Sequence, residues 1–253
     1  MRLCFSKDYS EVYDLLYKGK DYKKEFNFIK KIITKHQNKP KTLLDLGCGT
    51  GNYSNLMTKL NLNVTGIDIS KSMLKIAKSR YKKNKNLIFK ESNILKMNLK
   101  NKYDIVSALF HILSYQTSNE KINKFFKNSG KHLNKNGIFI FDFWYKEGVF
   151  NLQQPLRTRG VENKYFKVNR ITNSKWYKKK NLIEDVHNLI VLNKKNKLIR
   201  SFQETHPMKY FNLNTVKSFL KKNKFKFIKS LDLNTNKQLS KKSWGALVVA
   251  KKV

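Results

Sequence analysis

Residues 43–51, LLDLGCGTG, have the composition of a ligand-binding turn. Apolar residues run into Asp45, and three glycines follow at alternate positions. Glycine lacks a Cβ, so such a turn lets the backbone approach a ligand closely. The spacing differs from the G-x-G-x-x-G of nicotinamide dinucleotide sites, because Asn52 stands where the last glycine would be. The turn is therefore richer in glycine than a nicotinamide site requires.

A second acidic residue lies where a ribose could be recognised. Asp68 falls near the end of the run 63–69, NVTGIDI, which reads as the strand after the glycine turn. At that place an acidic side chain can accept hydrogen bonds from both ribose hydroxyls. A glycine triplet alone is a weak signal, but a triplet between a strand and a helix, with an acid at the next strand end, is specific.

The net charge of the chain is +37 over 253 residues. A field of that strength would attract nucleic acid or an anionic membrane. However, only six of the 54 basic residues are arginine, which leaves 48 lysines spread along the chain among many Asn and Ile residues. All three types have AT-rich codons, so genome composition explains the charge without any function. Either way, the charge favours anionic ligands.

Several classes of protein are excluded by composition. No apolar run reaches the roughly 18–20 residues of a membrane span, and the N-terminal stretch has no signal-peptide pattern, so we expect a soluble, cytoplasmic protein. Cys4 and Cys48 are too few for a disulfide framework, and Cys48 reads as a small filler in the glycine turn. No cluster has metal-ligand spacing, and no nucleophile–base pair suggests covalent catalysis.

Alternating strand and helix patterns must position these residues. Two amphipathic helices are expected ahead of the core, at 10–17 and 21–36. Strands are then expected at 42–46, 63–69, 86–91, 103–109 and 137–144, and helices at 52–60, 71–81 after a capping Ser70, and 118–133. This alternation predicts an α/β fold with a Rossmann-like, doubly wound parallel sheet.

Beyond Trp144 the pattern changes. Three β-leaning runs, at 164–171, 181–192 and 197–210, are joined by polar turns and predict an antiparallel insert. A helix at 214–222 and strands at 225–233 and 243–251 then complete a seven-stranded sheet, with the insert as a β lid over the ligand edge. We expect one domain over 1–253, made of N-terminal helices (1–39), a cofactor-binding core (40–148), the lid (149–211) and a C-terminal helix and strand hairpin (212–253).

Three core motifs resemble a known family. DLGCGTG at 45–51, GIDISKSML at 66–74 and YDIV at 103–106 are similar to the class I S-adenosylmethionine-dependent methyltransferases over roughly residues 40–145. The resemblance implies S-adenosyl-L-methionine as cofactor, with the glycines beneath its methionine part. The family often has an acid after the third strand, where this chain has Asn93. The cofactor-binding residues implied are Tyr22, Asp45, Gly47, Gly49, Gly51, Asp68, Ile69, Met73, Asn93, Ile94 and Leu109.

Segments outside the core narrow the resemblance. The stretches YDLLY at 13–17 and DFWY at 142–145, together with His206 and Tyr210, are similar to N-methyltransferases that dimethylate nucleotide-linked amino sugars. The implied partner is a small, anionic substrate of that kind, and the sequence is also compatible with a homodimer. Lys209 stands where such proteins often have Arg, which removes a bidentate phosphate contact.

Methyl transfer from a sulfonium is an in-line displacement that depends on positioning and on exclusion of water. An alkylamine with a pKa of about 10.4 is mostly protonated, so the site must favour its neutral form or take up its proton. The catalytic candidates are Tyr17, His111 and His206, and the substrate candidates are Tyr13, Tyr115, Trp144, Tyr145 and Tyr210. Each could instead pack in the core, although aromatic faces also suit sugars and cations. His36, His132 and His187 are expected to be solvated.

The reading that the sequence favours is N-methylation of a nucleotide-linked amino sugar, with a sugar hydroxyl as the next acceptor. The charge of +37 keeps an RNA or protein methyltransferase open. Against that alternative, the sequence has no N/D-P-P-Y motif and no added nucleic-acid module. A basic binding protein that keeps the fold without turnover is the remaining alternative.

Overall fold

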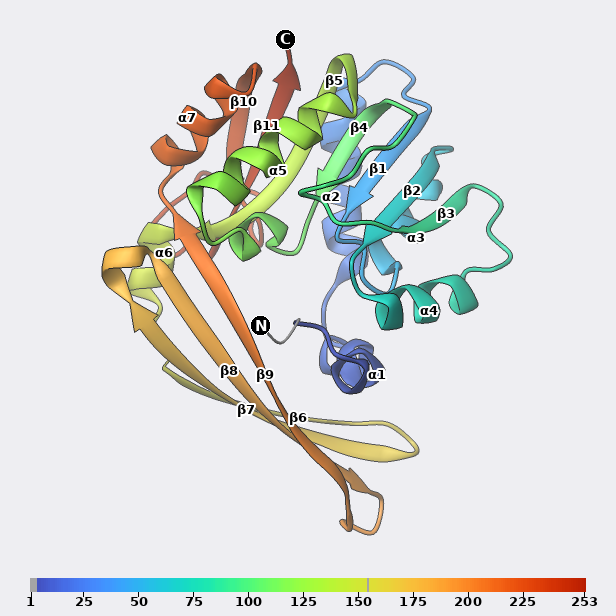
Figure 1. Cartoon of the computed structure of the whole chain (residues 1–253), viewed down its shortest axis with the longest axis vertical. Helices are drawn as coiled ribbons and strands as arrows, with labels where there is room; N and C mark the ends of the chain where they lie inside the picture. The colour runs from blue at the N-terminus through green and yellow to red at the C-terminus, as the bar shows by residue number, and fades with distance from the viewer. Residues whose placement is uncertain (1–3, 154) are drawn as a thin grey trace.

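The computed structural model describes residues 4–153 and 155–253. Its centre is a sheet in the order β3-β2-β1-β4-β5-β11-β10 (Figure 1). Neighbours from β3 to β5 pair in parallel, whereas β11 is antiparallel to β5 and β10 to β11. The bounds are β1 Thr42–Leu46, β2 Asn63–Asp68, β3 Leu87–Glu91, β4 Tyr103–Ala108, β5 Leu133–Tyr145, β10 Phe225–Asp232 and β11 Gly245–Lys252.

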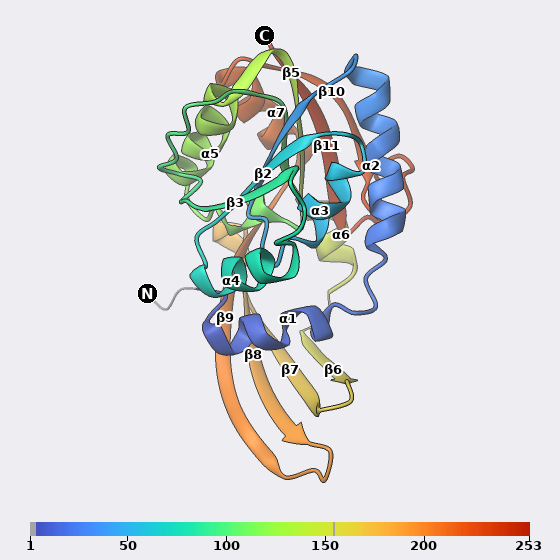
Figure 2. The ribbon, with the colours of Figure 1, turned by 90° about the vertical axis from the view of Figure 1, so that its right-hand side faces the viewer.

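Helices cover both faces of this sheet (Figure 2). One face packs against α2 (Tyr22–His36), α3 (Asn52–Thr58) and α4 (Lys71–Arg80), and the other against α5 (Asn119–Lys131) and α7 (Leu213–Lys222). Because both faces are covered, the central strands contain runs of buried apolar residues, such as Ile138–Phe141 of β5. The predicted cap of α4 is confirmed, since Ser70 Oγ accepts a hydrogen bond from Met73 N at 3.4 Å.

The lid is a four-stranded antiparallel meander in the order β9-β8-β7-β6. Its strands are β6 Leu156–Glu162, β7 Phe166–Tyr177, β8 Leu182–Asn193 and β9 Leu198–Phe211, with a short η2 turn, Lys178–Lys180, between β7 and β8. Helix α1 (Lys7–Leu16) lies between the lid and the carboxyl ends of the core strands (Figures 1 and 2). The lid and α1 therefore cover the edge at which α/β sheets bind ligands.

The predicted α/β class and antiparallel lid are confirmed, but the sheet has more than seven strands. Tyr210 and Phe211 at the end of β9 pair in parallel with Trp144 and Tyr145 at the end of β5, so the lid continues the core sheet to eleven strands. Sequence reasoning missed β6 because LRTRGVE is polar and lies at the sheet edge. It also missed η1 (Ile112–Tyr115) and α6 (Lys146–Asn151), each of about one turn.

The lid strand β7 extends further than predicted. The segment around Trp176 and Tyr177 was expected to be a polar turn, yet these residues pair with Ile183 and Leu182 of β8. In the segment before Trp176, outward-facing polar residues alternate with inward-facing ones. Such alternation indicates a strand less clearly than a continuous apolar run does.

The prediction that His132 and His187 are solvated is wrong. His132 at the end of α5 is 1% exposed, and its Nε2 accepts a hydrogen bond from Leu99 N at 2.9 Å. His187 on β8 is 7% exposed and lies 2.8 Å from Thr172 Oγ1 through its Nδ1. Strand alternation places His187 on the inner side of the lid, and a polar residue can be buried there because it has a partner.

None of the described helices is both long and apolar enough to cross a membrane.

Candidate active site

Asp45 supports the glycine turn from beneath. It is 3% exposed and accepts hydrogen bonds from Ser54 Oγ on α3 at 2.6 Å and Ser107 Oγ on β4 at 2.8 Å. Burial raises the pKa of Asp45 to about 6, although both hydrogen bonds oppose the rise. Asp45 thus fixes β1 to its neighbours and does not itself line the cavity described below.

The first two glycines of the turn differ in how much space surrounds them. Gly47 and Gly49 have φ of 71° and 54°, in the left-handed region that favours glycine. A Cβ on Gly47 would lie 2.3 Å from Cδ1 of Ile112, whereas one on Gly49 would have no neighbour within 4 Å. Gly49 therefore faces free space. Gly51 has a structural role instead, because it begins α3 and its Cβ would collide with the ring of Phe89.

Asp68 holds the glycine turn against the end of β2. Its Oδ2 accepts a hydrogen bond from Gly49 N and its Oδ1 accepts one from Ser70 N, both at 2.8 Å. Burial raises the pKa of Asp68, and these two backbone donors oppose the rise. The carboxylate is therefore fixed at the turn.

A cavity of about 260 Å³ lies between the glycine turn, α1 and the inner side of the lid. It brings together ten of the predicted site residues. These are Tyr13, Tyr17, Gly47, Gly49, Asp68, Met73, His111, Tyr115, Trp144 and His206.

The other predicted residues do not line this cavity. Tyr22 and Leu109 pack beside the α2–α3 side of the core, and Ile94 and Tyr145 beside the α5–α7 side. Tyr210 is 1% exposed and packs on Phe150. Asn93 Oδ1 accepts a hydrogen bond from Leu95 N, and Ile69 is 48% exposed on another surface.

His111 is paired with a buried carboxylate. Asp142 Oδ1 on β5 accepts a hydrogen bond from His111 N at 2.8 Å, and Asp142 Oδ2 lies 3.0 Å from His111 Nδ1, though out of line for a hydrogen bond. Asp142 is fully buried. The pair fixes the imidazole, and Nε2 has no hydrogen-bond partner among the described residues. The signal that sequence reasoning did not use is the single acid in the apolar run GIFIFDFW.

A second chain of polar groups enters from the lid. Tyr115 Oη lies 3.0 Å from His206 Nδ1, and His206 Nε2 lies 3.1 Å from Glu204 Oε2. Burial raises the pKa of Tyr115 well above its ordinary value, so its hydroxyl stays protonated. Burial alone would raise the pKa of Glu204 too, but hydrogen bonds from His206 and Ser6 outweigh it and lower the pKa. Glu204 is therefore an ionised carboxylate behind the histidine.

The inner side of the lid also carries arginines that sequence reasoning did not assign. Arg157 donates to Asp185 Oδ2 at 2.6 Å. Arg159 on β6 and Arg170 on β7 are direct cross-strand partners, and neither has a carboxylate partner among residues 4–153 and 155–253. Arg170 lines the cavity, and its Nη1 lies 3.5 Å from Tyr17 Oη. Two like charges side by side repel unless an anion lies between them.

Helix α1 is anchored to the core and to the lid. Asp14 accepts hydrogen bonds from Thr50 Oγ1 at 2.7 Å and Asn52 Nδ2 at 3.0 Å, next to the glycine turn. On the lid side, Glu204 accepts hydrogen bonds from Phe5 N and Ser6 N at 3.0 and 2.6 Å. These contacts close the cavity on the α1 side.

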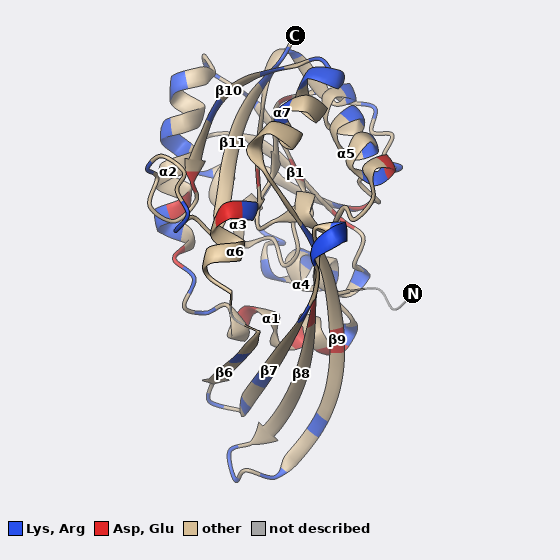
Figure 3. Ribbon diagram, turned by 90° about the vertical axis from the view of Figure 1, so that its left-hand side faces the viewer, with Lys and Arg blue, Asp and Glu red and all other residues tan. Residues whose placement is uncertain are grey.

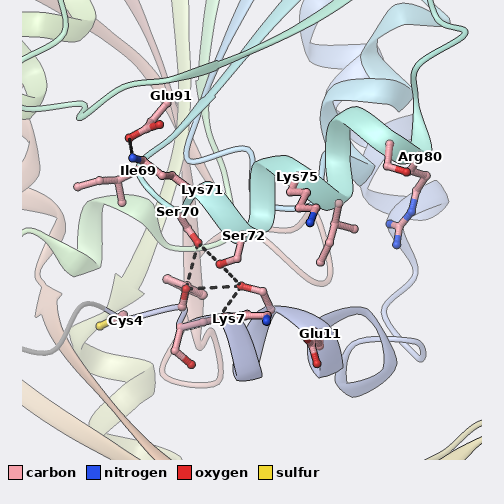
Figure 4. A pocket seen from close by; sticks show the side chains of 15 residues that line it. Cys4, Lys7, Glu11, Ile69, Ser70, Lys71, Ser72, Lys75, Arg80 and Glu91 are labelled. Atoms are coloured by element: carbon pink, nitrogen blue, oxygen red, sulfur yellow. Dashed lines mark hydrogen bonds and ion pairs between the residues drawn. The ribbon is translucent and has the colours of Figure 1, made fainter.

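A larger hollow, of about 1070 Å³, lies elsewhere, in the groove between α1 and α4 (Figure 4). Ser72 Oγ lies 3.0 Å from the hydroxyls of both Ser10 and Ser70, which joins the two helices at its base. Ile69 is the one predicted site residue in its lining, and the glycine turn does not reach it. We therefore place the active site in the smaller cavity, where the glycine turn and the histidines meet. Within the described part of the chain, no three His, Cys, Asp or Glu residues are grouped to hold a metal ion.

Comparisons with known proteins relate the core of the chain to methyltransferases. Residues 43–137 match the family model described as "Methyltransferase domain". The chain is 26% identical over 145 residues to a dTDP-3-amino-3,4,6-trideoxy-alpha-D-glucopyranose N,N-dimethyltransferase of Streptomyces venezuelae, covering 56% of this chain and 60% of the relative. It is 38% identical over 118 residues to a ubiquinone biosynthesis O-methyltransferase of Pelagibacter ubique, covering 45% and 48%. The chain thus spans about half the length of the curated relatives it matches.

Solved structures show the same fold over nearly the whole chain. An S-adenosylmethionine-dependent methyltransferase from Clostridium acetobutylicum superposes with a TM-score of 0.82 at 20% identity, covering 97% of this chain and 98% of that one. DesVI of Streptomyces venezuelae gives 0.82 at 21% identity, covering 98% and 100%. The lid and α1 are therefore included in the shared fold.

Proposed function

We propose, from the premise that residues 43–137 form a methyltransferase domain, that this protein methylates the amino group of a nucleotide-linked sugar with S-adenosylmethionine as cofactor. One observation carries the proposal: a single cavity is lined by Gly49, Asp68, His111 and Arg170. We take residues 1–253 to act as one domain. We also propose a cytoplasmic location, which the two free thiols, Cys4 and Cys48, support.

The residues at the glycine turn support binding of part of the cofactor there. Gly49 faces open space, Asp68 offers a fixed carboxylate, and Met73 adds a buried apolar wall. These residues and Gly47 are the ones we assign to S-adenosylmethionine. When bound, the cofactor supplies an electrophilic methyl group on a sulfonium.

His111 is assigned as the group that accepts the proton of the amine. Asp142 orients the ring from its Nδ1 side and leaves Nε2 available. An amine must lose a proton to attack, and a positioned imidazole can take it. Because α1 and the lid cover the cavity, water is kept from competing with the acceptor.

The lid arginines support an anionic acceptor. Arg159 and Arg170 lie opposite one another without an acidic partner among the described residues, so a phosphate group would relieve their repulsion. The sugar would lie near His111, and the nucleotide would lie towards the arginines. The Streptomyces venezuelae relative, an N,N-dimethyltransferase of a dTDP-linked amino sugar, supports the same substrate class.

A sugar hydroxyl is the second candidate acceptor. A hydroxyl needs a base more than an amine does, and the Tyr115–His206–Glu204 chain reaches the cavity with an ionised carboxylate behind it. An RNA acceptor is disfavoured, because a base in a polymer would have to pass between α1 and the lid. The O-methyltransferase among the relatives keeps the hydroxyl alternative open.

The test is transfer of labelled methyl from S-adenosylmethionine to three pools: nucleotide-linked amino sugars, the matching sugars with hydroxyl in place of amine, and total RNA. We expect label in the amino sugars, lost in the His111→Gln variant. Label found only in the hydroxyl sugars would show that the acceptor atom is oxygen and not nitrogen. Label in RNA that persists at 0.2 M salt would overturn the proposed substrate class, because phosphate-driven binding to a basic surface weakens steeply with salt.

A further inference from the structure

The end of the core that lies opposite the cavity is covered by lysines. Six segments that lead into core strands meet there, at 37–41, 59–62, 81–86, 99–104, 131–136 and 221–226. We call this surface the basic end. Figure 3 shows Lys and Arg segments gathered at the end of the core that bears the C-terminus, away from the lid. The exposed lysines of the basic end are Lys39, Lys41, Lys59, Lys82, Lys83, Lys85, Lys100, Lys102, Lys131, Lys135, Lys221, Lys222, Lys224 and Lys226.

Genome composition explains the number of lysines in the chain but not their position. The 33 residues of the basic end include 14 lysines, whereas the whole chain has 54 basic residues among 253. Codon bias would raise the lysine content evenly, yet basic residues are about twice as dense here as on average. Of the 17 acidic residues in the chain, only Asp104 lies in these segments. The basic end is therefore a local concentration of one charge.

Asp104 is already engaged by neutral donors. Its carboxylate accepts hydrogen bonds from Lys41 N and Thr42 N, at 2.8 and 3.0 Å, and from Asn134 Nδ2 at 2.8 Å. Burial alone would raise the pKa of Asp104, but these hydrogen bonds outweigh it and lower the pKa. The carboxylate thus fixes the start of β4 to the start of β1.

The ammonium groups of the basic end are almost all without a partner. Among residues 4–153 and 155–253, none of the fourteen forms an ion pair, and only Lys131 has a hydrogen bond from its Nζ, to Asn98 Oδ1 at 2.8 Å. The structural task of bonding the last carbonyls of α5 is performed by another residue, since Lys252 Nζ donates to Gly130 O and Leu133 O at 2.6 and 3.0 Å. The charge of the basic end is therefore available to an external partner.

The shape of the basic end suits a flat partner. Adjacent strands lie about 4.8 Å apart, so the seven strands from β3 to β10 make the end about 29 Å wide. Helices about 10 Å across cover both faces, which gives it a thickness of roughly 30 Å. The lysines come from both faces and both edges, and none of them lines the two cavities described above. The charge is thus spread in two dimensions and is not confined to a groove.

The composition disfavours other partners. The basic end has no arginine and no exposed aromatic ring, the groups that stack on unpaired bases. Lysine is depleted in protein–protein interfaces, which disfavours an acidic protein. There is also no exposed apolar side chain among these residues, so contact with a lipid surface would be electrostatic and reversible.

We propose that the basic end docks on the anionic headgroups of a membrane, with the cavity facing away from the lipid. Anionic lipids attract clustered lysines, and each lysine near the surface strengthens binding about fivefold. The carboxyl ends of the parallel strands, α1 and the lid lie at the opposite end of the molecule (Figure 1). The docked protein therefore keeps its cavity open to a substrate dissolved in the aqueous phase.

The first test compares two variants of equal net charge. Each replaces four exposed lysines by glutamine, and only the position differs. The basic-end variant changes Lys83, Lys102, Lys135 and Lys224, and the lid variant changes Lys175, Lys179, Lys195 and Lys197. Partitioning of the full chain onto vesicles of about 30% phosphatidylglycerol in phosphatidylcholine is measured at about 0.1 M salt, where charges more than ~10 Å from the surface are screened.

We expect the basic-end variant to partition at least 50-fold more weakly than the unchanged chain, and the lid variant within about fivefold of it. Vesicles of phosphatidylcholine alone should not bind. Equal partitioning of the two variants, or equal binding to neutral and anionic vesicles, would overturn the proposal. Thermal unfolding of both variants checks that the fold is retained.

Duplex RNA is the competing polyanion, and its binding is measured on the same three proteins. If the basic-end variant loses binding to the duplex and keeps binding to the vesicles, the partner is a nucleic acid and the membrane is excluded.

The orientation is tested with two single fluorescent labels. Asn101→Cys places a label on the basic end and Ser201→Cys places one on the lid, both at exposed positions and both in a Cys4→Ser chain, in which the remaining Cys48 is buried. A quencher attached to the lipid headgroup should reduce the emission of the first label and leave the second unchanged. Equal quenching of both, or quenching of the lid label alone, would contradict the proposed orientation.

Discussion

Asp142 contacts His111 at two points. Its Oδ1 accepts a hydrogen bond from the backbone N–H of His111 at 2.8 Å, and its Oδ2 lies 3.0 Å from His111 Nδ1. His111 has a φ of 67°, which is uncommon for a residue other than glycine, and the carboxylate helps to hold this conformation at the end of β4. The backbone bond and the ring contact therefore act on the same loop. A variant that removes the negative charge of Asp142 but keeps an oxygen for the backbone bond therefore tests the charge without releasing the loop.

Replacing Asp142 by Asn should lower kcat about 10²-fold while leaving the Kd for S-adenosylmethionine nearly unchanged. The amide can still accept the bond from His111 N, but it no longer stabilises a protonated imidazole. Initial rates against pH, and cofactor titration by calorimetry, measure the two effects. His36→Asn, a change at a half-buried histidine on α2, is the control. An unchanged kcat in Asp142→Asn would remove His111 from the mechanism.

Replacing Asp68 by Asn should weaken binding of S-adenosylmethionine by roughly 10- to 100-fold, because hydrogen bonds to a charged group contribute about 1.5–3 kcal/mol each. The two carboxylate oxygens of Asp68 accept hydrogen bonds from Gly49 N and Ser70 N. The side-chain amide of Asn has a single acceptor oxygen, so it can replace only one of these bonds. Calorimetry gives the Kd directly. Glu91→Gln, at an exposed acid at the end of β3, should bind as before. Equal Kd values for the two variants would contradict the assignment of Asp68.

Replacing Arg170 by Gln should raise the KM for the nucleotide-linked acceptor about 10- to 100-fold and reduce the dependence of KM on salt. Removing one of two adjacent guanidinium groups takes away a contact to phosphate, whereas the chemistry at His111 is unaffected. Steady-state kinetics at two salt concentrations measure both changes. Lys179→Gln, in the exposed η2 turn, is the control for net charge. A drop in kcat at constant KM would show that Arg170 does not bind the substrate.

The stability of the lid should depend on pH through His187. Burial, and then the charge of His206, lower the pKa of His187 from 6.5 to about 2. The unfolded chain therefore binds a proton below pH 6.5 that the folded chain does not, so the stabilisation is complete above pH 6.5 and decreases as pH falls. The loss is at most about 1.4 kcal/mol per pH unit for this one group.

The corresponding variant is His187→Asn, which keeps a polar partner for Thr172 and does not titrate. Urea unfolding at pH 7 and pH 5 gives the free energy of unfolding for both proteins. We expect the difference between the two pH values to be smaller in the variant by roughly 2 kcal/mol. The same difference in both proteins would mean that His187 is protonated in the folded state.

The sequence predicts the parts of the molecule that depend on neighbouring residues. The strand, glycine turn and helix from 42 to 58 are local, and so is the acid at the end of β2. The pairing of His111 with Asp142, and of Arg159 with Arg170, depends on the register between strands, which single-sequence patterns do not give.

Local sequence patterns also do not predict which polar residues of the lid are buried. The run from Leu182 to Asn193 reads as a strand, but its polar inner residues, such as His187, resemble solvated ones until α1 covers them. Tyr210 shows the converse, because it is an aromatic residue near the site that packs behind the lid and does not face the cavity.

Glu204 accepts hydrogen bonds from Phe5 and Ser6, which lie 199 and 198 positions earlier in the chain. During translation, the start of α1 leaves the ribosome long before its partner exists. At about 5–20 residues per second, it waits roughly 10–40 s for β9 to emerge. The glycine turn and the parallel strands β1 to β5 can form in that interval, but the cavity under the lid cannot close. A nascent chain therefore exposes the glycine turn and Asp68 to solvent before β9 is present to cover the cavity that they line.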